Sequence, residues 1–149
     1  MATQAERGAQ LSPLPFLFFT DGTPMTAPSL ITFAPDQAGE AIFDHPAEAR
    51  RVSGNPQRVT RPFYTDALGE FDCGEWTCEV GAWRITFGAH RQEYFSVIEG
   101  RIRISDLDGN VSEFGPGDAC VIPAGFEGVF EVVEPVRKHF VMFERKAQS

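Results

Sequence analysis

The sequence lacks any long apolar run, which argues against a membrane-spanning helix. Such a helix needs about 20 consecutive apolar residues. The apolar stretch LPFLFF, residues 14–19, is short, contains Pro15 and directly follows Pro13. It also lacks a positively charged leader that ends at a small-residue cleavage site. We therefore expect neither a bilayer-crossing helix nor a secretory signal peptide.

Positive charge is also scarce. Thirteen Lys and Arg residues stand against 21 Asp and Glu residues, so the formal net charge is −8 at pH 7. An acidic protein is repelled by nucleic acids and by anionic membranes, and we expect neither as a partner. One segment, RRVSGNPQRVTR, contains Arg50, Arg51, Arg58 and Arg61 without an acidic residue between them. We interpret it as a solvated or intersubunit strap; an anion-binding patch is the alternative.

Cysteine is scarce as well. Cys73, Cys78 and Cys120 make an odd number and form no Cys-x-x-Cys pair, so neither a disulfide framework nor a paired-cysteine zinc site is indicated. This usage is typical of a reducing compartment, and we predict a cytoplasmic protein. We interpret the three thiols as buried apolar fillers; Cys73 and Cys78 would be reactive only if exposed.

What the sequence does contain favours one packed domain built from short elements. It has 149 residues, 42% of them hydrophobic, with 14 Phe, 14 Gly and 11 Pro scattered along the chain. That length suits a single hydrophobic core. Frequent Gly and Pro interrupt long helices. An all-β architecture is therefore expected.

Apolar and polar residues alternate over much of the second half, as they do in half-buried strands. The segments that show strand character are residues 75–80, 83–87, 93–100, 101–105, 111–114, 119–123, 128–134 and 136–144. Asp108-Gly109 predicts a tight hairpin turn, because both residues tolerate positive φ. Before residue 60 the pattern is looser, with candidate strands at 16–20 and 30–34 and a possible helical turn at 46–51. Short strands at this spacing predict a sandwich or a small barrel.

The spacing of several residues resembles the two signature motifs of the cupins. The first motif runs in register from Gly81 through Glu93 to Gly100, and the second from Gly117 through Pro123 and Gly125. The resemblance implies a jelly-roll barrel, also called a double-stranded β-helix, with an irregular N-terminal arm. Residues 70–144 more narrowly resemble the cupin branch named for ureidoglycine aminohydrolase, whereas we identify no resemblance for the first 60 residues. The domains expected are an arm at 1–60, packed on the barrel or on a partner subunit, and a barrel at 61–149.

Typical cupins hold a divalent metal with three histidines and one glutamate, and here the resemblance breaks down. The histidine positions fall on Phe87, Ala89 and Gly128, and only Glu93 remains of the four ligands. A transition metal usually needs at least three protein donors of nitrogen, oxygen or sulfur type. The standard site therefore cannot form, and we predict no metal and no cofactor. A rebuilt site that uses Glu93, His90 and His139 is the alternative.

The lumen of the predicted barrel is a candidate small-molecule site. If Glu93 points inward as in the family, strand alternation gives a largely apolar cavity around it, and the predicted ligand-binding residues are Phe87, Ala89, Glu93, Phe95, Gly128 and Phe130. A carboxylate among hydrocarbons needs a cation nearby, and Lys138 is the first candidate. Glu93 and Lys138 are therefore the predicted polar anchors and, in an enzyme, the candidate catalytic pair.

Three functions remain open from the sequence. The first is a metal-independent protein, most consistent with a homodimer, that binds a small polar and nitrogen-containing metabolite. The second is a metal-dependent hydrolase, isomerase or oxygenase with a rebuilt site. The third is a structural or regulatory barrel whose lumen is filled by its own side chains, with a Glu93–Lys138 pair that only completes the core. Whether the protein is an enzyme is left open.

Overall fold

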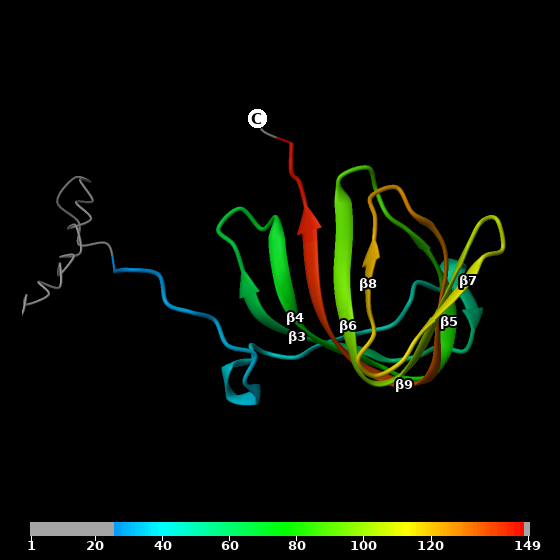
Figure 1. Cartoon of the computed structure of the whole chain (residues 1–149), viewed down its shortest axis with the longest axis horizontal. Helices are drawn as coiled ribbons and strands as arrows, with labels where there is room; N and C mark the ends of the chain where they lie inside the picture. Colours follow the sequence, from blue (N-terminus) through cyan, green and yellow to red (C-terminus); the bar gives the residue numbers. More distant parts are fainter. Residues whose placement is uncertain (1–25, 148–149) are drawn as a thin grey trace, which may run out of the picture.

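A computed structural model describes residues 26–147, in which an antiparallel sheet curls around a central space (Figure 1). Within this part of the chain there are nine strands and two short 3₁₀ turns. The strands are β1 (Ile42–Asp44), β2 (Arg51–Ser53), β3 (Arg58–Thr65), β4 (Phe71–Cys78), β5 (Gly81–Thr86), β6 (Arg91–Asp106), β7 (Val111–Phe114), β8 (Ala119–Ile122) and β9 (Glu127–Glu144), and the turns are η1 (Pro35–Gln37) and η2 (Glu48–Arg50). The expected all-β class is confirmed.

The long strands β6 and β9 connect the two walls of the barrel. Residues 91–97 of β6 pair with the C-terminal half of β9, which also pairs with β4, and β3 and β1 continue that wall. The C-terminal half of β6 pairs with the N-terminal half of β9, which also pairs with β5, and β2 lies beyond β5. The remaining side of β6 pairs with β8 at one end and with β7 at the other. All nine strands of residues 26–147 therefore belong to one sheet that curls around the lumen.

The two long strands bend where a glycine and a proline meet. Gly100 has φ +86°, and a Cβ added to it would collide with the carbonyl oxygen of Pro135. The β6–β9 register shifts between Val97 and Ile102 at the same place. Such irregularities increase strand bending and tolerate a proline that cannot donate to the ladder. Residues 93–100 and 101–105, predicted as separate segments, are therefore one strand, as are 128–134 and 136–144.

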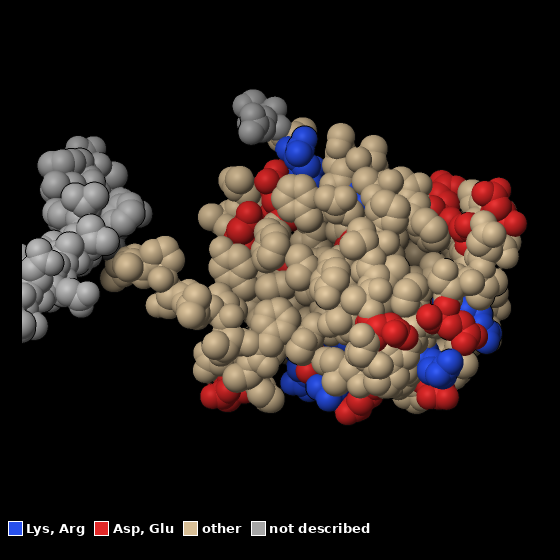
Figure 2. Space-filling model, in the orientation of Figure 1, with Lys and Arg blue, Asp and Glu red and all other residues tan. Residues whose placement is uncertain are grey.

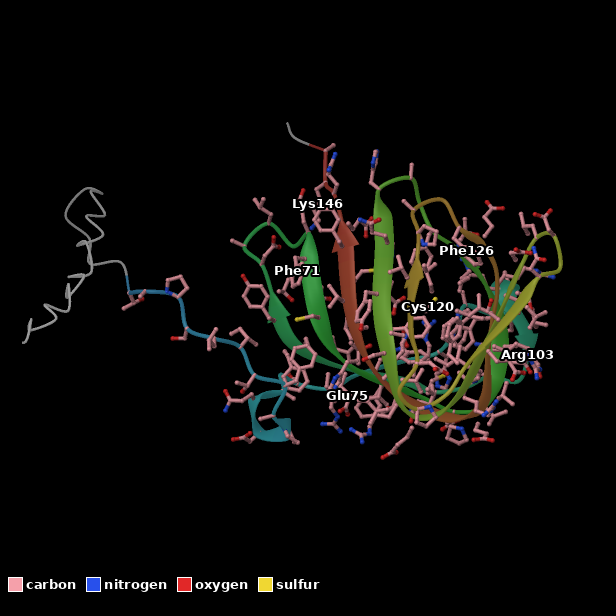
Figure 3. The ribbon with its side chains drawn as sticks, viewed as in Figure 1. Phe71, Glu75, Arg103, Cys120, Phe126 and Lys146 are labelled. Atoms are coloured by element: carbon pink, nitrogen blue, oxygen red, sulfur yellow. The ribbon has the colours of Figure 1, made fainter. Side chains whose placement is uncertain are left out.

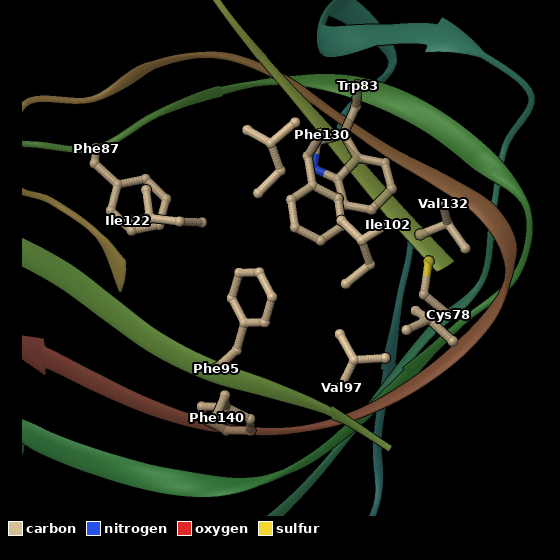
Figure 4. Packing of buried hydrophobic residues seen from close by; sticks show 12 residues of the cluster. Cys78, Trp83, Phe87, Phe95, Val97, Ile102, Ile122, Phe130, Val132 and Phe140 are labelled. Carbon is tan, nitrogen blue, oxygen red and sulfur yellow. The ribbon is translucent and has the colours of Figure 1, made fainter. Parts of the chain in front are cut away.

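Alternation along the strands places the core inside the curl. Figure 4 shows Trp83 of β5, Phe87 just after β5, Phe95 of β6 and Phe130 of β9 pointing into the enclosed space. Phe95 belongs, together with Ile102 and Val132, to the largest fully buried side chains. Burying one such side chain stabilises a fold by about 1.5–3 kcal/mol. The aromatic cluster is therefore a major stabilising element as well as the wall of the lumen.

The predicted hairpin lies between β6 and β7. Gly109 has φ +85°, and one carboxylate oxygen of Asp106 accepts hydrogen bonds from the backbone N–H groups of Asp108 and Asn110 at 2.9 Å each. The Asn110 side-chain amide donates to the other oxygen of Asp106 at 2.8 Å. These bonds, with their largest contribution from the Asn110 side chain, lower the pKa of Asp106.

The N-terminal predictions have mixed outcomes. The candidate strand at 16–20 lies outside the described residues, and the one at 30–34 is wrong because this segment pairs with no strand. Instead, Phe33 stacks on Phe63 of β3 with ring centroids 4.5 Å apart. The predicted helical turn at 46–51 corresponds to the 3₁₀ turn η2, which is one turn long. β1 and β2 lie within the predicted arm and pair with β3 and β5, whereas contact with a partner subunit stays a prediction.

Two of the four arginines in the arginine-rich segment, Arg51 and Arg58, make contacts within the chain. The Arg58 guanidinium donates to Asp44 at 2.8 and 2.7 Å and lies 5.4 Å from the centroid of the Trp83 ring. Arg51 donates to the carbonyl oxygen of Pro46 at 3.0 Å. These contacts hold β1 and η2 against the barrel, which fits a strap better than an anion-binding patch.

The charged groups lie mostly around the periphery of the face in Figure 2, where the centre is largely uncharged. Exposed apolar side chains are also present, among them Ile42 and Phe43 on β1 and Val121 on β8. Residues 26–147 contain no helix that combines the length and hydropathy required to cross a membrane.

Candidate functional site

The lumen contains a cavity of about 260 Å³ that opens toward the end of the barrel where β6 begins and β9 ends. Its walls come from both sides of the curled sheet. The lining residues are Thr60, Asp72, Trp76, Trp83, Ile85, Phe87, Arg91, Glu93, Ile122, Phe130, Lys138, Phe140 and Met142. Most of them are apolar or aromatic, with four ionisable side chains among them. A mainly apolar cavity with a few fixed polar groups is typical of a small-molecule site.

A buried ion pair lies within the cavity wall. The Lys138 ammonium group donates to Oε1 of Glu93 at 2.8 Å, and the two residues are only 3% and 8% exposed. Lys138 Nζ also lies 4.6 Å from the ring centroid of Trp76, 4.4 Å from that of Phe95 and 5.1 Å from that of Phe130. The carboxylate and the electron-rich ring faces both favour the ammonium charge. The pairing expected from the sequence is therefore present.

The second carboxylate oxygen of Glu93 is available to the cavity. Oε2 has no hydrogen-bond partner within residues 26–147, and in that part of the chain no side-chain N or O atom is both fully buried and unpartnered. It follows that Oε2 retains accessible surface. Because Glu93 lines the cavity, a ligand N–H or O–H group can reach this oxygen.

The structure brings together most of the predicted ligand-binding residues. Phe87, Glu93 and Phe130 line the cavity, as does Lys138. Phe95 contributes from behind: it is fully buried and lies against the Lys138 ammonium group.

Two predicted residues lie apart from the cavity. Ala89 is exposed in the turn after β5, because that strand ends at Thr86 instead of continuing to residue 89. Gly128 is buried but does not line the cavity, and a Cβ added there would collide with the carbonyl oxygen of Ser105. Its small size serves the close approach of β9 and β6 and does not widen the cavity.

The donor atoms of the lumen do not fit the typical cupin metal. Of the four family ligand positions, only Glu93 carries a donor side chain. His90 is exposed and lines a separate depression with Glu70 and Lys146. His139 follows inward-facing Lys138 and packs edge-on against Phe33 of the arm at 4.9 Å. The rebuilt site of Glu93, His90 and His139 is therefore not assembled, and residues 26–147 contain no group of three His, Cys, Asp or Glu side chains placed to hold a metal ion.

Two charged residues at the cavity, Asp72 and Arg91, were not predicted from the sequence. Strand alternation offered a signal for Arg91, which stands two residues before Glu93 and shares its face. For Asp72 the signal was weaker, since β4 begins at Phe71, earlier than the predicted start at residue 75. The Arg91 guanidinium carbon lies 5.7 Å from the ring centroid of Phe87. Both side chains give the cavity opening a polar rim.

The cysteines offer no activated nucleophile. Burial raises the pKa of Cys78 to about 12. Burial also raises the pKa of Cys120, a shift increased by the negative charge of Glu93 and partly offset by Lys138. Figure 3 shows Cys120 on β8 and Phe126 in the loop that follows this strand. The thiolate is the reactive form of cysteine, so these groups are inert at neutral pH.

A curled antiparallel sheet with two long shared strands and a central cavity defines the jelly-roll barrel of the cupins. Sequence comparison places the chain within this class. A family model described as the EutQ-like cupin domain matches residues 65–140. The chain therefore belongs to the EutQ-like cupin family. None of the proteins with curated descriptions matches it.

Similar solved structures support the fold. A protein of unknown function from Pseudomonas syringae pv. tomato str. DC3000, of the DUF861 family, is 20% identical with a TM-score of 0.62; the match covers 70% of this chain but 44% of that one. The EutQ protein of Clostridium difficile is 23% identical, with a TM-score of 0.52 and 66% and 79% coverage of the two chains. A putative ethanolamine utilization protein Q from Salmonella typhimurium LT2 is 16% identical, with a TM-score of 0.54 and 72% and 98% coverage. At these identities the likeness concerns the fold alone.

Proposed function

We propose that the barrel binds a small polar organic molecule in its lumen, anchored by Glu93 and Lys138, without the typical cupin metal. The observation that carries this proposal is that the two oxygens of the Glu93 carboxylate differ in their contacts. Oε1 of Glu93 is held by Lys138, Oε2 has no hydrogen-bond partner within residues 26–147, and Glu93 lines a cavity of about 260 Å³. A buried pair that only completed a core would be expected to leave no such open acceptor.

The size and walls of the cavity restrict the ligand. Its volume lies just below the roughly 300–1,000 Å³ typical of sites for drug-sized molecules, which indicates a small metabolite. Aromatic walls favour an apolar part, and Glu93 Oε2 accepts a hydrogen bond from an N–H or O–H group. The empty volume also argues against a barrel filled completely by its own side chains. The catalytic roles of Glu93 and Lys138 depend on this binding and remain predictions.

Three finer assignments rest on the sequence alone. The ureidoglycine aminohydrolase-like branch is one, because the matching family is described as EutQ-like and the three similar structures described above do not carry that enzyme's name. Homodimerisation and a cytoplasmic location are the others.

A thermal-shift screen of small polar metabolites tests the proposal. A ligand present at 100 times its Kd stabilises the folded state by about 2.7 kcal/mol, which raises Tm by roughly 5–11 °C for a chain of this size. Glu93→Gln keeps the side-chain shape and should abolish the shift, whereas Glu99→Gln, which changes an exposed carboxylate, should preserve it. The proposal is contradicted if no metabolite stabilises the protein, or if stabilisation is the same in Glu93→Gln.

A further inference from the structure

The cavity carries balanced charge. Its four ionisable lining residues are Asp72, Arg91, Glu93 and Lys138, two acidic and two basic. Glu93 and Lys138 are already paired with each other. The other two charges are one carboxylate, on Asp72, and one guanidinium, on Arg91, which lies 3.5 Å from the exposed Glu144. A ligand that matches this wall needs both signs of charge and no net charge.

The strand register shows how the charges are arranged. Asp72 of β4 and Glu93 of β6 both stand opposite Met142 of β9, one on each side of it. Neighbouring strands lie about 4.8 Å apart, so the two backbones are roughly 10 Å apart and their side chains can converge on one group between them. Arg91 lies two residues from Glu93 on the same face, roughly 7 Å along β6 toward the strand end. The two carboxylates and the guanidinium thus line one stretch of the cavity wall.

These groups keep unused hydrogen-bonding capacity. Oδ1 of Asp72 accepts a hydrogen bond from the Thr65 hydroxyl at 2.9 Å, and within residues 26–147 its Oδ2 has no partner. Arg91 donates to Glu144 at 3.5 Å, and both of these side chains are about half exposed. An exposed pair at such a distance contributes little and is easily exchanged. Asp72 and Arg91 form no salt bridge with each other, so a ligand need not break one to bind both.

From this arrangement we infer that the ligand is a small zwitterion with an apolar end, of the class of an apolar α-amino acid. The inference rests on the proposed function and specifies its ligand class. The ligand ammonium group donates to Asp72 and to Oε2 of Glu93, and its carboxylate accepts from the Arg91 guanidinium, the side chain best suited to that geometry. The apolar end contacts the walls formed by Phe87, Ile122 and Phe140.

Ligands that carry a single charge match the cavity less well. A simple amine satisfies the carboxylates but leaves Arg91 with only its weak, exposed contact to Glu144. A simple carboxylate reaches Arg91 but leaves Asp72 unmatched and adds negative charge beside Glu93. An inorganic dianion meets two carboxylates and a single guanidinium in the cavity wall, and like charges in close contact are strongly unfavourable. The charge arrangement therefore selects for a zwitterion and against each of its halves.

Isothermal titration calorimetry with matched probes tests this inference. Each set contains an amino acid, the acid that lacks its amino group and the amine that lacks its carboxylate, built on valine, leucine and phenylalanine. In at least one set the zwitterion should bind about tenfold or more tightly than either half, since a hydrogen bond to a charged group contributes about 1.5–3 kcal/mol and tenfold corresponds to 1.4 kcal/mol.

Variants assign each end of the ligand. Arg91→Gln should weaken binding of the amino acid and of the acid about tenfold or more but leave binding of the amine unchanged. Asp72→Asn should weaken binding of the amino acid and of the amine and leave binding of the acid unchanged. Arg101→Gln, an exposed arginine paired with Glu113, serves as the control and should bind like the wild type. Circular dichroism and Tm verify folding; if Asp72→Asn does not fold, Arg91→Gln still decides the carboxylate end.

Two failures are distinguishable. If each zwitterion binds no better than its halves, or if Arg91→Gln leaves binding of the amino acid unchanged, the inference is overturned. The proposed function still stands in that case, provided another metabolite from the screen binds in a Glu93-dependent manner. If neither the matched sets nor the metabolite screen contains any binder, both are overturned.

Discussion

Replacing Lys138 by methionine should strongly destabilise the protein. The substitution keeps a long unbranched side chain but removes the ammonium group that lies 2.8 Å from Glu93 Oε1. At an effective dielectric constant of about 20, the direct attraction across this 2.8 Å distance is roughly 6 kcal/mol before desolvation is subtracted. Removing one member of a buried pair typically costs about 3–5 kcal/mol, because the other charge stays buried without compensation. For a chain of this size that corresponds to a fall in Tm of roughly 6–20 °C.

Glu93→Leu should destabilise the fold less than Lys138→Met, because three aromatic rings still surround the Lys138 ammonium group. The double variant Glu93→Leu/Lys138→Met should recover most of the stability, since hydrophobic replacements of buried pairs are often neutral or stabilising. Glu99→Leu removes one carboxylate from an exposed pair with Arg137 and should have a much smaller effect.

Urea unfolding at pH 7 measures these differences, with Trp76 and Trp83 of the lumen as fluorescent reporters. The reasoning is refuted if Lys138→Met costs less than about 1 kcal/mol, the upper range of an exposed pair. It is also refuted if the losses of the two single variants simply add in the double variant, because additivity means that the residues do not interact.

Three further expectations follow from the same structure. Burial raises the pKa of Cys78 to about 12, so a disulfide reagent at pH 8 should label Cys78 only after unfolding. Because this folded-state pKa exceeds the ordinary 9.0, the stability of the fold should decrease as pH rises from about 9 toward 12. Cys78→Ala should remove this pH dependence. Hydrogen bonds, chiefly from Arg103, lower the pKa of Glu113. The ionised Glu113 therefore stabilises the fold above the ordinary pKa of 4.5, and this stabilisation is lost as pH falls through the lowered pKa. Glu113→Gln should flatten the acid limb of a stability–pH profile, and an unchanged limb would contradict this. Finally, β1 pairs with β3 on one side only and exposes Ile42 and Phe43, so we expect the protein to be a homodimer through this edge. Light scattering should show a dimer for the wild type and a monomer for Phe43→Glu, and a monomeric wild type would exclude the dimer.

The fold was largely predictable from the sequence, because alternation and turn residues act locally. Gly109 lies in the predicted hairpin turn, and each segment with strand character after residue 70 overlaps a barrel strand, although β4 begins at Phe71, four residues before the predicted start. The continuity of β6 and β9 was not predictable in this way. Gly100 and Pro135 each break a strand in a one-dimensional pattern, yet in the barrel they lie against each other at a bend that tolerates both.

The candidate site was predictable where a general physical requirement applied. A carboxylate in an apolar lumen needs a cation, and this rule identified Lys138 as the partner of Glu93. Ala89 and Gly128 were placed by family spacing, which fails where β5 ends early and where β9 approaches Ser105. Asp72 joins the site through strand register across β9, a long-range property that no local pattern contains, whereas Arg91 shares the face of Glu93 by alternation along β6.

The central claim is that this barrel recognises an organic ligand through Glu93 and does not hold the typical cupin metal. Elemental analysis of the purified wild type and of Glu93→Gln, each after incubation with manganese, iron, nickel or zinc and then dialysis, tests it most directly. We expect far less than one equivalent of metal per chain, with no difference between the two proteins. One equivalent retained by the wild type and lost in Glu93→Gln would contradict it.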